Sequence, residues 1–349
     1  MMNDVIKGDI RTIADSLKDM SGKTRENTFL VTGGAGFLGT WMCDVLVEMG
    51  AKVICVDNLV VGTKENIDHL MTNKNFKFIE ADILEYEPDE KIDYIIHMAS
   101  IASPMVYFEH PIETMDTNAI ATKKMLELGI RKNIKGFLLT STSEIYGNPP
   151  NEAIPTPETY YGMINTTSTR AMYDESKRMA ETYCYYYFKK HKSPVRIVRI
   201  FNTYGPRLDS GLSTTYGRAL INFVRQAMGN QPLTIYGDGK QTRSFCYIID
   251  NMKGLLRFLL TDGLDGEIVN IGNPQEITIL DLAQRILKST GSKSEIKTNS
   301  QPAHYNINDD PKRRCPNTEK AKKLFGYEPS VLVDDGLRKM VAQMKIPNQ

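Results

Sequence analysis

The sequence has little of what marks a secreted, disulfide-stabilised or metal-dependent protein. Its five cysteines are scattered without a CxxC pair, so neither a disulfide framework nor a zinc ribbon is expected. The five histidines show no ligand spacing, and we predict no metal site. This cysteine usage fits a reducing cytoplasm best.

Charge of one sign and long apolar runs are also lacking. Lysines and arginines number 43 against 42 acidic residues, and the net charge of +1 provides no overall field for nucleic acid or an anionic membrane. No run of about 18 apolar residues is present, so no membrane span is expected. Any anionic ligand must therefore be bound by local groups.

The first 24 residues carry charges throughout, which excludes the apolar centre of a signal peptide. Ile6, Ile10, Ile13 and Leu17 recur at the spacing of one helix face. We predict an N-terminal helical extension over 1–24 that packs on the body of the protein. A regulatory or dimer-contact role is the alternative.

Short runs rich in Val, Ile and Phe alternate with longer helical patterns through the first 200 residues. The runs are TFLVT from 28, KVICVD from 52, FKFIEAD from 76, DYIIHMA from 93, GFLLTST from 136 and VRIVRI from 195. Continuous apolar runs are typical of strands buried on both faces, and their alternation with helices indicates right-handed βαβ units. The predicted fold class is α/β, a doubly wound parallel Rossmann sheet with a smaller C-terminal substrate-binding lobe.

The pattern changes after FNTYGPR at 201–207. The next stretch is irregular, and a further strand at 267–272 precedes helical stretches at 278–290 and 318–325. The predicted units are a Rossmann domain over 25–203 with a returning segment near 243–271, and a lobe over 204–242 and 272–349.

VTGGAGFLG at 31–39 follows the first strand and opens a helix. Gly33, Gly36 and Gly39 allow a tight turn and close approach to a pyrophosphate, which the amides at a helix start can bind. Asp57 ends the second strand, where a carboxylate accepts hydrogen bonds from a ribose and repels a 2′-phosphate, so NAD is favoured over NADP. The alternative is a plain strand-to-helix turn. Further candidate cofactor-binding residues are Phe37, Leu38, Asn58, Asp82, Ile83 and Ala99.

Asp82 has an alternative role as the cap of a following helix. His97, at the end of the fourth strand, is expected to pack there rather than to act in catalysis.

Tyr173 and Lys177 lie four residues apart and would share one helix face. A neighbouring cation lowers the pKa of a tyrosine, so this pair suits proton transfer, although such a spacing also occurs by chance. Thr142, Ser143 and Glu144 end the fifth strand, at the sheet edge where ligands gather in parallel sheets. A Thr142 hydroxyl and a Tyr173 phenolate could hold a substrate alcohol, with Lys177 also bonding the nicotinamide ribose.

These motifs resemble those of the extended short-chain dehydrogenases/reductases, in the nucleotide-sugar branch. TGGAGFLG, the Tyr173/Lys177 pair, RIFNTYGPR and YGDGKQTRSF occur in that family's order, and the similarity runs from about residue 27 to 345. Within the branch, TSTSEIYG, YDESKRMAETYCYYY, GKQTRSFCYIIDN and DDPKRRCPNTEKAKKLFGYEP resemble segments of UDP-glucuronate decarboxylases, which make UDP-xylose.

The resemblance implies a UDP-sugar substrate, NAD, and C4 oxidation with Tyr173 as base, followed by loss of CO2 and C4 re-reduction. Ser143 stands where dehydratases of the branch have an aspartate, and Glu144 with Arg314 would handle the hexuronate end. It also implies a homodimer through the Tyr173 helix and a helix at 112–130. The family-matched substrate-binding candidates are Asn202, Arg207, Arg218, Tyr236, Arg243 and Arg314.

Three places depart from the family pattern near the expected sugar or nicotinamide. Ile101 occupies a position where the family usually has proline, and Met163 one where it has histidine. Residues 166–169 replace a stretch that contains proline and glycine in the family. A UDP-hexuronate or UDP-hexose 4-epimerase is therefore the first alternative activity. The second alternative is a nucleotide-sugar dehydratase. A non-catalytic NAD-sensing scaffold is the alternative from another class, and the complete acid–base set argues against it.

Overall fold

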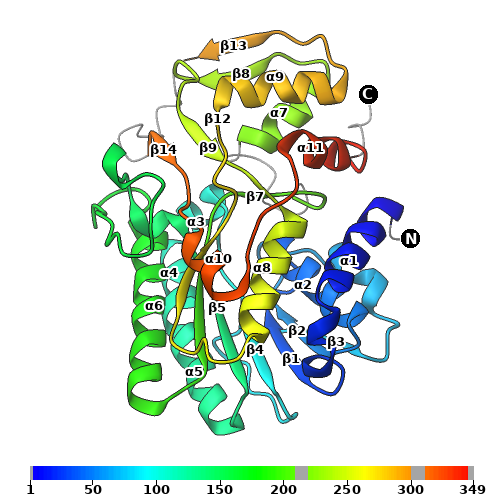
Figure 1. The fold of residues 1–349 in the computed structure, drawn as a ribbon, viewed down its shortest axis with the longest axis vertical. Coiled ribbons are helices and arrows are strands. Elements are labelled where there is room, and N and C mark those ends of the chain that lie inside the picture. The colour runs from blue at the N-terminus through cyan, green and yellow to red at the C-terminus, as the bar shows by residue number, and fades with distance from the viewer. Residues whose placement is uncertain (1–2, 209–218, 300–310, 345–349) are drawn as a thin grey trace.

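The core of the protein is a seven-stranded parallel sheet (Figure 1). The structure is a computed structural model that describes residues 3–208, 219–299 and 311–344. The strand order is β11-β6-β5-β4-β1-β2-β3. Their bounds are β1 (Thr28–Thr32), β2 (Lys52–Asp57), β3 (Phe76–Glu80), β4 (Tyr94–His97), β5 (Gly136–Thr142), β6 (Val195–Ile200) and β11 (Ile268–Ile271). Each apolar run of the sequence forms a strand, and the predicted doubly wound α/β fold is confirmed.

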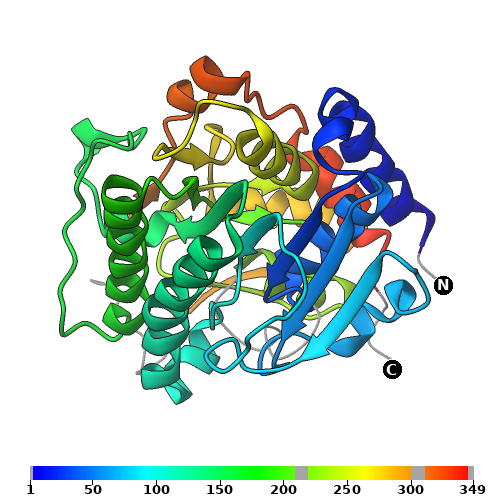
Figure 2. The same ribbon diagram turned by 90° about the horizontal axis from the view of Figure 1, so that it is seen from below.

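Helices cover both faces of this sheet (Figure 2). Along β1, Phe29 and Val31 point into the core shared with α2 (Phe37–Glu48) and α8 (Ile248–Leu260), while Leu30 points into the core on the other face. That second core contains α5 (Ala121–Lys132) and α6 (Ala171–His191). Burial on both faces explains why the strands are almost continuously apolar. None of the described helices is long and apolar enough to cross a membrane.

Shorter helical segments connect these elements. They are α3 (Pro104–Glu109), α4 (Pro111–Met115), a π-helical turn (Asp116–Ile120), and 3-10 segments at Lys18–Lys23, Lys64–Asn66, Asp68–Leu70, Ser143–Tyr146 and Asn151–Ala153. The helix expected at 112–130 therefore consists of α4, the π-helical turn and α5.

The N-terminal helix α1 (Asp4–Ser16) packs against α2 and α8, as predicted. Its isoleucine stripe is buried. Asp9 is also buried, and its carboxylate accepts a hydrogen bond from the Tyr247 hydroxyl at 2.6 Å and pairs with the Lys339 ammonium at 2.5 Å. Because Lys339 lies on α11 (Val333–Val341), α1 is bonded to a helix near the other end of the chain.

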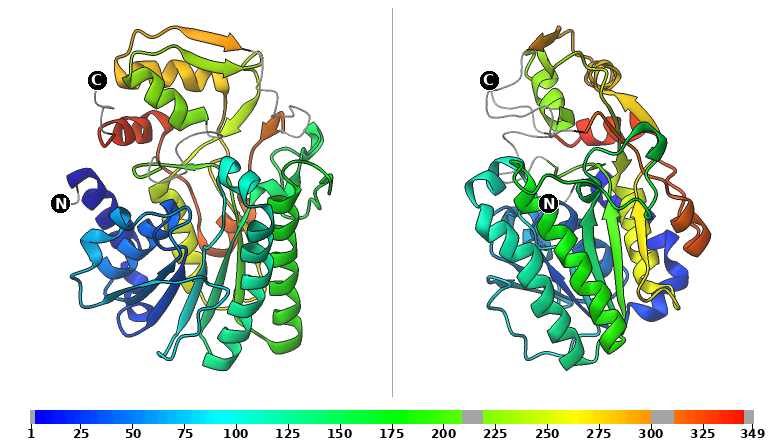
Figure 3. Two further views of the ribbon diagram at one scale, coloured as in Figure 1. Left: turned by 180° about the vertical axis from the view of Figure 1, so that it is seen from behind. Right: turned by 90° about the vertical axis from the view of Figure 1, so that its left-hand side faces the viewer.

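A smaller lobe lies beyond the carboxyl ends of the strands (Figures 1 and 3). It contains α7 (Ala219–Met228), α9 (Ile279–Thr290), the parallel pair β8 (Leu233–Tyr236) and β13 (Ile296–Asn299), and the three-stranded sheet β12 (Glu276–Thr278), β9 (Thr242–Ser244) and β14 (Arg313–Arg314). Two short paired strands, β7 (Thr203–Tyr204) and β10 (Cys246–Tyr247), lie below it.

Helix α10 (Glu319–Phe325) packs beside β11 of the main sheet. The two helices expected at 278–290 and 318–325 are thus present, although they lie in different regions. The boundaries proposed for the two domains stay a prediction.

Candidate active site

A cavity of about 880 Å³ lies between the carboxyl ends of the strands and the lobe. It brings together most residues that the sequence singled out, although they come from positions far apart in the chain. The predicted residues that line it are Gly33, Gly36, Phe37, Leu38, Gly39, Asp57, Asn58, Ile83, Ala99, Thr142, Ser143, Glu144, Tyr173, Lys177, Asn202, Tyr236, Arg243 and Arg314.

The glycine-rich turn between β1 and α2 forms one end of the cavity. Gly33 has φ +69°, and a Cβ there would lie 2.7 Å from the Cα of Ala99. A Cβ on Gly39 would lie 2.1 Å from the carbonyl oxygen of Gly33. Gly36 caps α2 without a side-chain hydrogen bond, which leaves the first amides of the helix for an anionic group.

Asp57 lies beside this turn at the end of β2. Its carboxylate accepts hydrogen bonds from the amides of Ala35 at 3.0 Å and Leu59 at 2.8 Å. Burial raises the pKa of Asp57, while these amides favour its charged form. A buried acceptor at this place fits the hydroxyls of an adenosine ribose.

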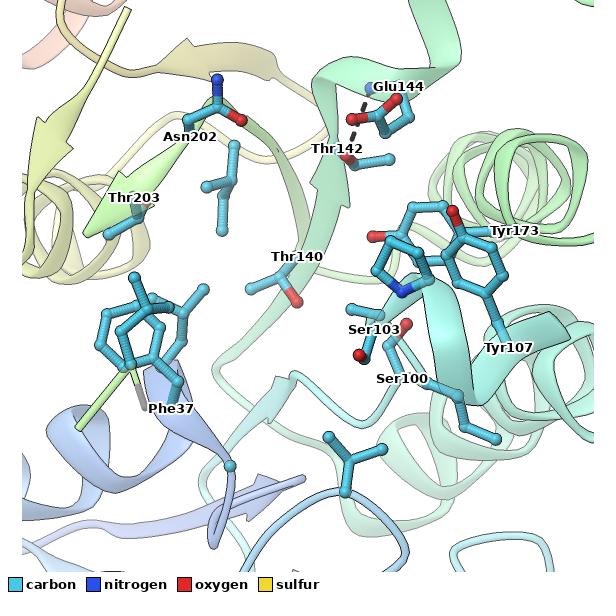
Figure 4. Close-up of a pocket in the computed structure, with 18 of the residues that line it drawn as sticks. Phe37, Ser100, Ser103, Tyr107, Thr140, Thr142, Glu144, Tyr173, Asn202 and Thr203 are labelled. Atoms are coloured by element: carbon cyan, nitrogen blue, oxygen red, sulfur yellow. Dashed lines mark hydrogen bonds between the residues drawn. The ribbon is translucent and has the colours of Figure 1, made fainter. Parts of the chain in front are cut away.

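Tyr173 and Lys177 lie one turn apart on α6 and face the cavity. The Lys177 ammonium donates to the carbonyl of Thr140 at 3.0 Å and lies 6.0 Å from the centre of the Tyr173 ring. Burial lowers the pKa of Lys177 to about 8, although Glu181 opposes the shift. The Tyr173 ring stacks on Tyr107, with ring centres 5.6 Å apart, and both rings lie across the cavity from Asn202 (Figure 4).

Thr142 orients the residues that follow β5. Its hydroxyl accepts a hydrogen bond from the amide of Glu144 at 3.2 Å, the dashed contact in Figure 4. This bond caps the 3-10 segment that starts at Ser143. The three residues are therefore held together near Tyr173.

Glu144 forms ion pairs with two arginines, Arg170 and Arg314. Burial alone would raise the pKa of Glu144, but Arg170, Arg314 and the nearby Arg243 outweigh it and the pKa is below its ordinary value. The resemblance had linked Arg314 with this glutamate, whereas Arg170 was missed. Its position three residues before Tyr173, on the same side of the helix start, is the signal that could have found it.

Comparison with known proteins places the chain in a family. Residues 29–272 match the NAD dependent epimerase/dehydratase family. The chain belongs to this family. UDP-glucuronic acid decarboxylase 1 from Xenopus tropicalis is 43% identical over 325 residues, which cover 93% of this chain and 73% of that protein. UDP-glucuronic acid decarboxylase 3 from Arabidopsis thaliana is 41% identical, covering 91% and 89% of the two chains.

The solved structures most useful for comparison are epimerases. UDP-glucuronic acid 4-epimerase from Bacillus cereus, solved with UDP-glucuronic acid and NAD, aligns with a TM-score of 0.78 at 28% identity, over 90% of this chain and 98% of that one. UDP-glucose 4-epimerase from Thermotoga maritima aligns with a TM-score of 0.80 at 28% identity, with the same coverage.

The NAD-dependent epimerase/dehydratase family uses the cofactor predicted from the sequence, and the site fits it. The cradle at Gly33 and Gly39 has no room for a Cβ, the α2 amides face the cavity end, and the Asp57 carboxylate suits an unphosphorylated ribose. Within the described residues, no group of three or more His, Cys, Asp or Glu side chains could hold a metal ion.

Three candidate binding residues are not found in the cavity lining. The Arg207 guanidinium pairs with Asp44 at 2.5 Å and lies 5.3 Å from the ring of Trp41, and both of these residues are on α2. Asp82 is exposed and accepts a hydrogen bond from the amide of Leu84 at 2.8 Å in a turn with no helix after it. Arg218 lies outside the described residues.

The places that depart from the family pattern do not all lie in the cavity. Ile101 and Thr169 line the cavity, but Met163 is 80% exposed and is not among the lining residues, so the expectation that it lies near the sugar is wrong. His97 is packed, as expected: its Nδ1 lies 2.8 Å from the Thr32 hydroxyl, and burial lowers its pKa to about 3.

Proposed function

We propose that this enzyme converts UDP-glucuronate to UDP-xylose by C4 oxidation, loss of CO2 and C4 re-reduction. The observation that carries the proposal is Glu144 held between Arg170 and Arg314 beside Thr142 and Tyr173. The names of the two curated relatives described above support it, because both are UDP-glucuronic acid decarboxylases, at 43% and 41% identity. Ser143 supports it as well, because a serine has no carboxyl group with which to protonate a leaving hydroxyl.

Bound NAD supplies the acceptor, and later the donor, of the C4 hydride. The Tyr173 phenolate, near the Lys177 charge, takes the proton of the C4 hydroxyl and returns it at the end of the cycle. Thr142 donates a hydrogen bond to the same oxygen. Once C4 is a ketone, the C6 carboxylate is β to it, so the C5–C6 bond breaks and its electron pair moves onto the C4 oxygen. Tyr173 and Thr142 stabilise that enolate. C5 then takes a proton from a water molecule positioned by Glu144 as the electron pair returns from the C4 oxygen, and the C4 ketone is formed again before the hydride returns.

The cations around Glu144 suit the hexuronate end of the sugar. Arg170, Arg314 and Arg243 place three positive charges around one ionised carboxylate. A second carboxylate, the one on the sugar, is therefore attracted to this end of the cavity, and the planar guanidinium groups can bind it through two bonds each.

The test is to incubate the NAD-loaded protein with UDP-glucuronate and to measure product masses. We expect a product lighter by one CO2, and conversion about a thousandfold slower by the Tyr173→Phe variant. A product of unchanged mass would replace the decarboxylase by an epimerase, and loss of one water would indicate a dehydratase. If UDP-glucuronate and other UDP-sugars remain unconverted while NAD is bound, a non-catalytic NAD-sensing role is favoured.

A UDP-glucuronate 4-epimerase is the second candidate. The Bacillus cereus epimerase has the same fold over nearly the whole chain and was solved with UDP-glucuronic acid. Ile101 and Thr169, two of the departures from the decarboxylase pattern, line the cavity. An epimerase would turn the 4-keto sugar over and reduce it from the other face, with no CO2 released.

We further propose that the protein is a homodimer through α6 and the segment α4 to α5. Apolar side chains are exposed on these elements, including Ile112 at 59% and Tyr186 at 63%. Tyr and Ile are suited to a subunit interface. We expect the protein to sediment as a dimer and Tyr186→Lys to weaken it; a monomer at micromolar concentration would contradict this.

All five cysteines are free and buried, which supports the proposed cytoplasmic location.

A further inference from the structure

Asp174 is a buried carboxylate close to Arg170, one of the two arginines that pair with Glu144. It follows Tyr173 on α6 and is 6% exposed, and it does not line the cavity. Its Oδ1 has no hydrogen-bond partner among the described residues, and its Oδ2 lies 4.0 Å from the Nε of Arg170. Arg170 thus stands between two carboxylates, the paired Glu144 and the poorly bonded Asp174.

The groups that act on Asp174 come from four elements. Glu144 follows β5, Arg314 lies on β14, Tyr107 lies on α3, and Arg170 and Glu175 are at or near the start of α6 itself. Burial and the Glu144 charge raise the pKa of Asp174 to about 7, against the opposite effects of Arg170 and Arg314. The carboxyl is therefore close to half protonated at neutral pH.

We propose that Asp174 takes up a proton when the hexuronate carboxylate binds. In its neutral form Asp174 no longer competes for the charge of Arg170, which then pairs with Glu144 and the substrate carboxylate. Asp174 is in this sense a positioning residue, because it acts through Arg170. The inference rests on the proposed function, since it requires a carboxylated sugar in the cavity.

The reason is the balance of charge at this end of the cavity. Glu144 is ionised and Asp174 is close to half protonated at neutral pH, and the substrate brings a further carboxylate to the same end. Repulsion between like charges at low dielectric favours protonation of the carboxyl with the fewest hydrogen bonds. Glu144 has two arginine partners, whereas Asp174 has an unbonded oxygen, so Asp174 is the one that becomes neutral.

The test measures protons taken up on binding by calorimetry in two buffers of different ionisation enthalpy. The NAD-loaded Tyr173→Phe variant is used because its turnover should be slow enough for binding to be measured, with UDP-glucuronate as ligand and UDP-xylose as the matched ligand without a carboxylate. We expect UDP-glucuronate to take up about 0.5–0.9 more protons than UDP-xylose at pH 8, falling to about 0.1 at pH 6, where the carboxyl is already protonated.

Two second substitutions in the same background assign the proton. Asp174→Asn should abolish the extra uptake at pH 8. Glu175→Gln removes the neighbouring carboxylate paired with Arg178, which has a smaller effect on the pKa of Asp174 than Glu144, Arg170 or Arg314, and should leave most of the uptake. Equal uptake with both ligands, or uptake that survives Asp174→Asn, would overturn the inference. Failure of UDP-glucuronate to bind at all would instead overturn the proposed function.

A measurement on stability covers the case in which Asp174→Asn binds no ligand. A carboxyl whose pKa is raised on folding contributes stability at low pH that is lost as the pH rises through about 7. We therefore expect Asp174→Asn to raise Tm relative to the unsubstituted protein by more at pH 8 than at pH 5. An equal Tm difference at the two pH values would show that Asp174 does not titrate as required, and the inference would fall.

Discussion

The two ends of the cavity bind by different means. At the dinucleotide end, a turn without room for a Cβ presents backbone amides, and the Asp57 carboxylate is held by amides. At the sugar end, charged side chains from separate elements meet, with Glu144 between Arg170 and Arg314. One end thus selects its ligand by backbone shape and the other by balanced charge. Substitutions at the two ends should therefore fail in different ways.

The largest effect is expected at the proton-transfer residue between the two ends. Tyr173→Phe keeps the ring and its stacking on Tyr107 but loses the hydroxyl. We expect turnover of UDP-glucuronate to fall about a thousandfold, the middle of the range for an acid–base group, while NAD binding is retained. Turnover near that of the unsubstituted protein would mean that Tyr173 is only a packing residue.

The next largest effect is expected from a substitution that impairs the sugar end alone. Glu144→Gln removes the charge that the two arginines share, while oxidation depends on Thr142, Tyr173 and Lys177. We expect CO2 release to fall about a hundredfold and reduced cofactor to accumulate, measured together as CO2 and as NADH absorbance. A parallel fall in oxidation and CO2 release would show that the two ends are not separable, and an epimerase would lose little and release no CO2 in either form.

A smaller effect breaks the dinucleotide end alone. Gly33→Ala places a Cβ 2.7 Å from the backbone of Ala99 at a positive φ, so the turn must shift. We expect NAD affinity by calorimetry to fall about tenfold or more. Gly263→Ala is the matched control, because Gly263 has φ +77° with nothing within 4 Å of the added Cβ. Equal losses of NAD affinity in both variants would point to backbone strain rather than to the cradle.

The smallest effect is expected at Asp57, the carboxylate that would face the ribose at the dinucleotide end. Asp57→Asn keeps one oxygen acceptor but removes the charge that disfavours a 2′-phosphate. We expect NADP affinity to improve about fivefold relative to NAD, read as the ratio of the two dissociation constants, because charge repulsion at a buried site is worth about 1 kcal/mol or more. An unchanged ratio would show that backbone shape alone decides between the dinucleotides.

The dinucleotide end was predictable because its signals are local. Gly33, Gly36 and Gly39 lie in one short segment of the sequence, and Asp57 ends the next strand, so a parallel sheet places them together. The sugar end was only partly predictable, because its charges come from η5 (Ser143–Tyr146), the start of α6, and β14, which meet only through tertiary packing. Arg170 was missed for this reason.

Arg207 shows the same limit from the other direction. Its motif, RIFNTYGPR, suggested a contact with the substrate, but the buried carboxylate of Asp44 holds the guanidinium against α2. A sequence shows that an arginine is present but not which acid will pair with it. Its assignment to the substrate site stays a prediction, as does that of Arg218.

The ion pair between Asp9 and Lys339 has a consequence for how the chain is made. These residues are separated by 330 positions. At synthesis rates of roughly 5–20 residues per second, the helix that carries Asp9 waits roughly 15 to 70 seconds for its charged partner. Until then Asp9 has no cation to compensate its burial, and burying an unpaired charge is strongly unfavourable. With both Asp9 contacts formed, α1 therefore docks only after α11 has been synthesised, and until then the N-terminal segment is open to proteases and chaperones.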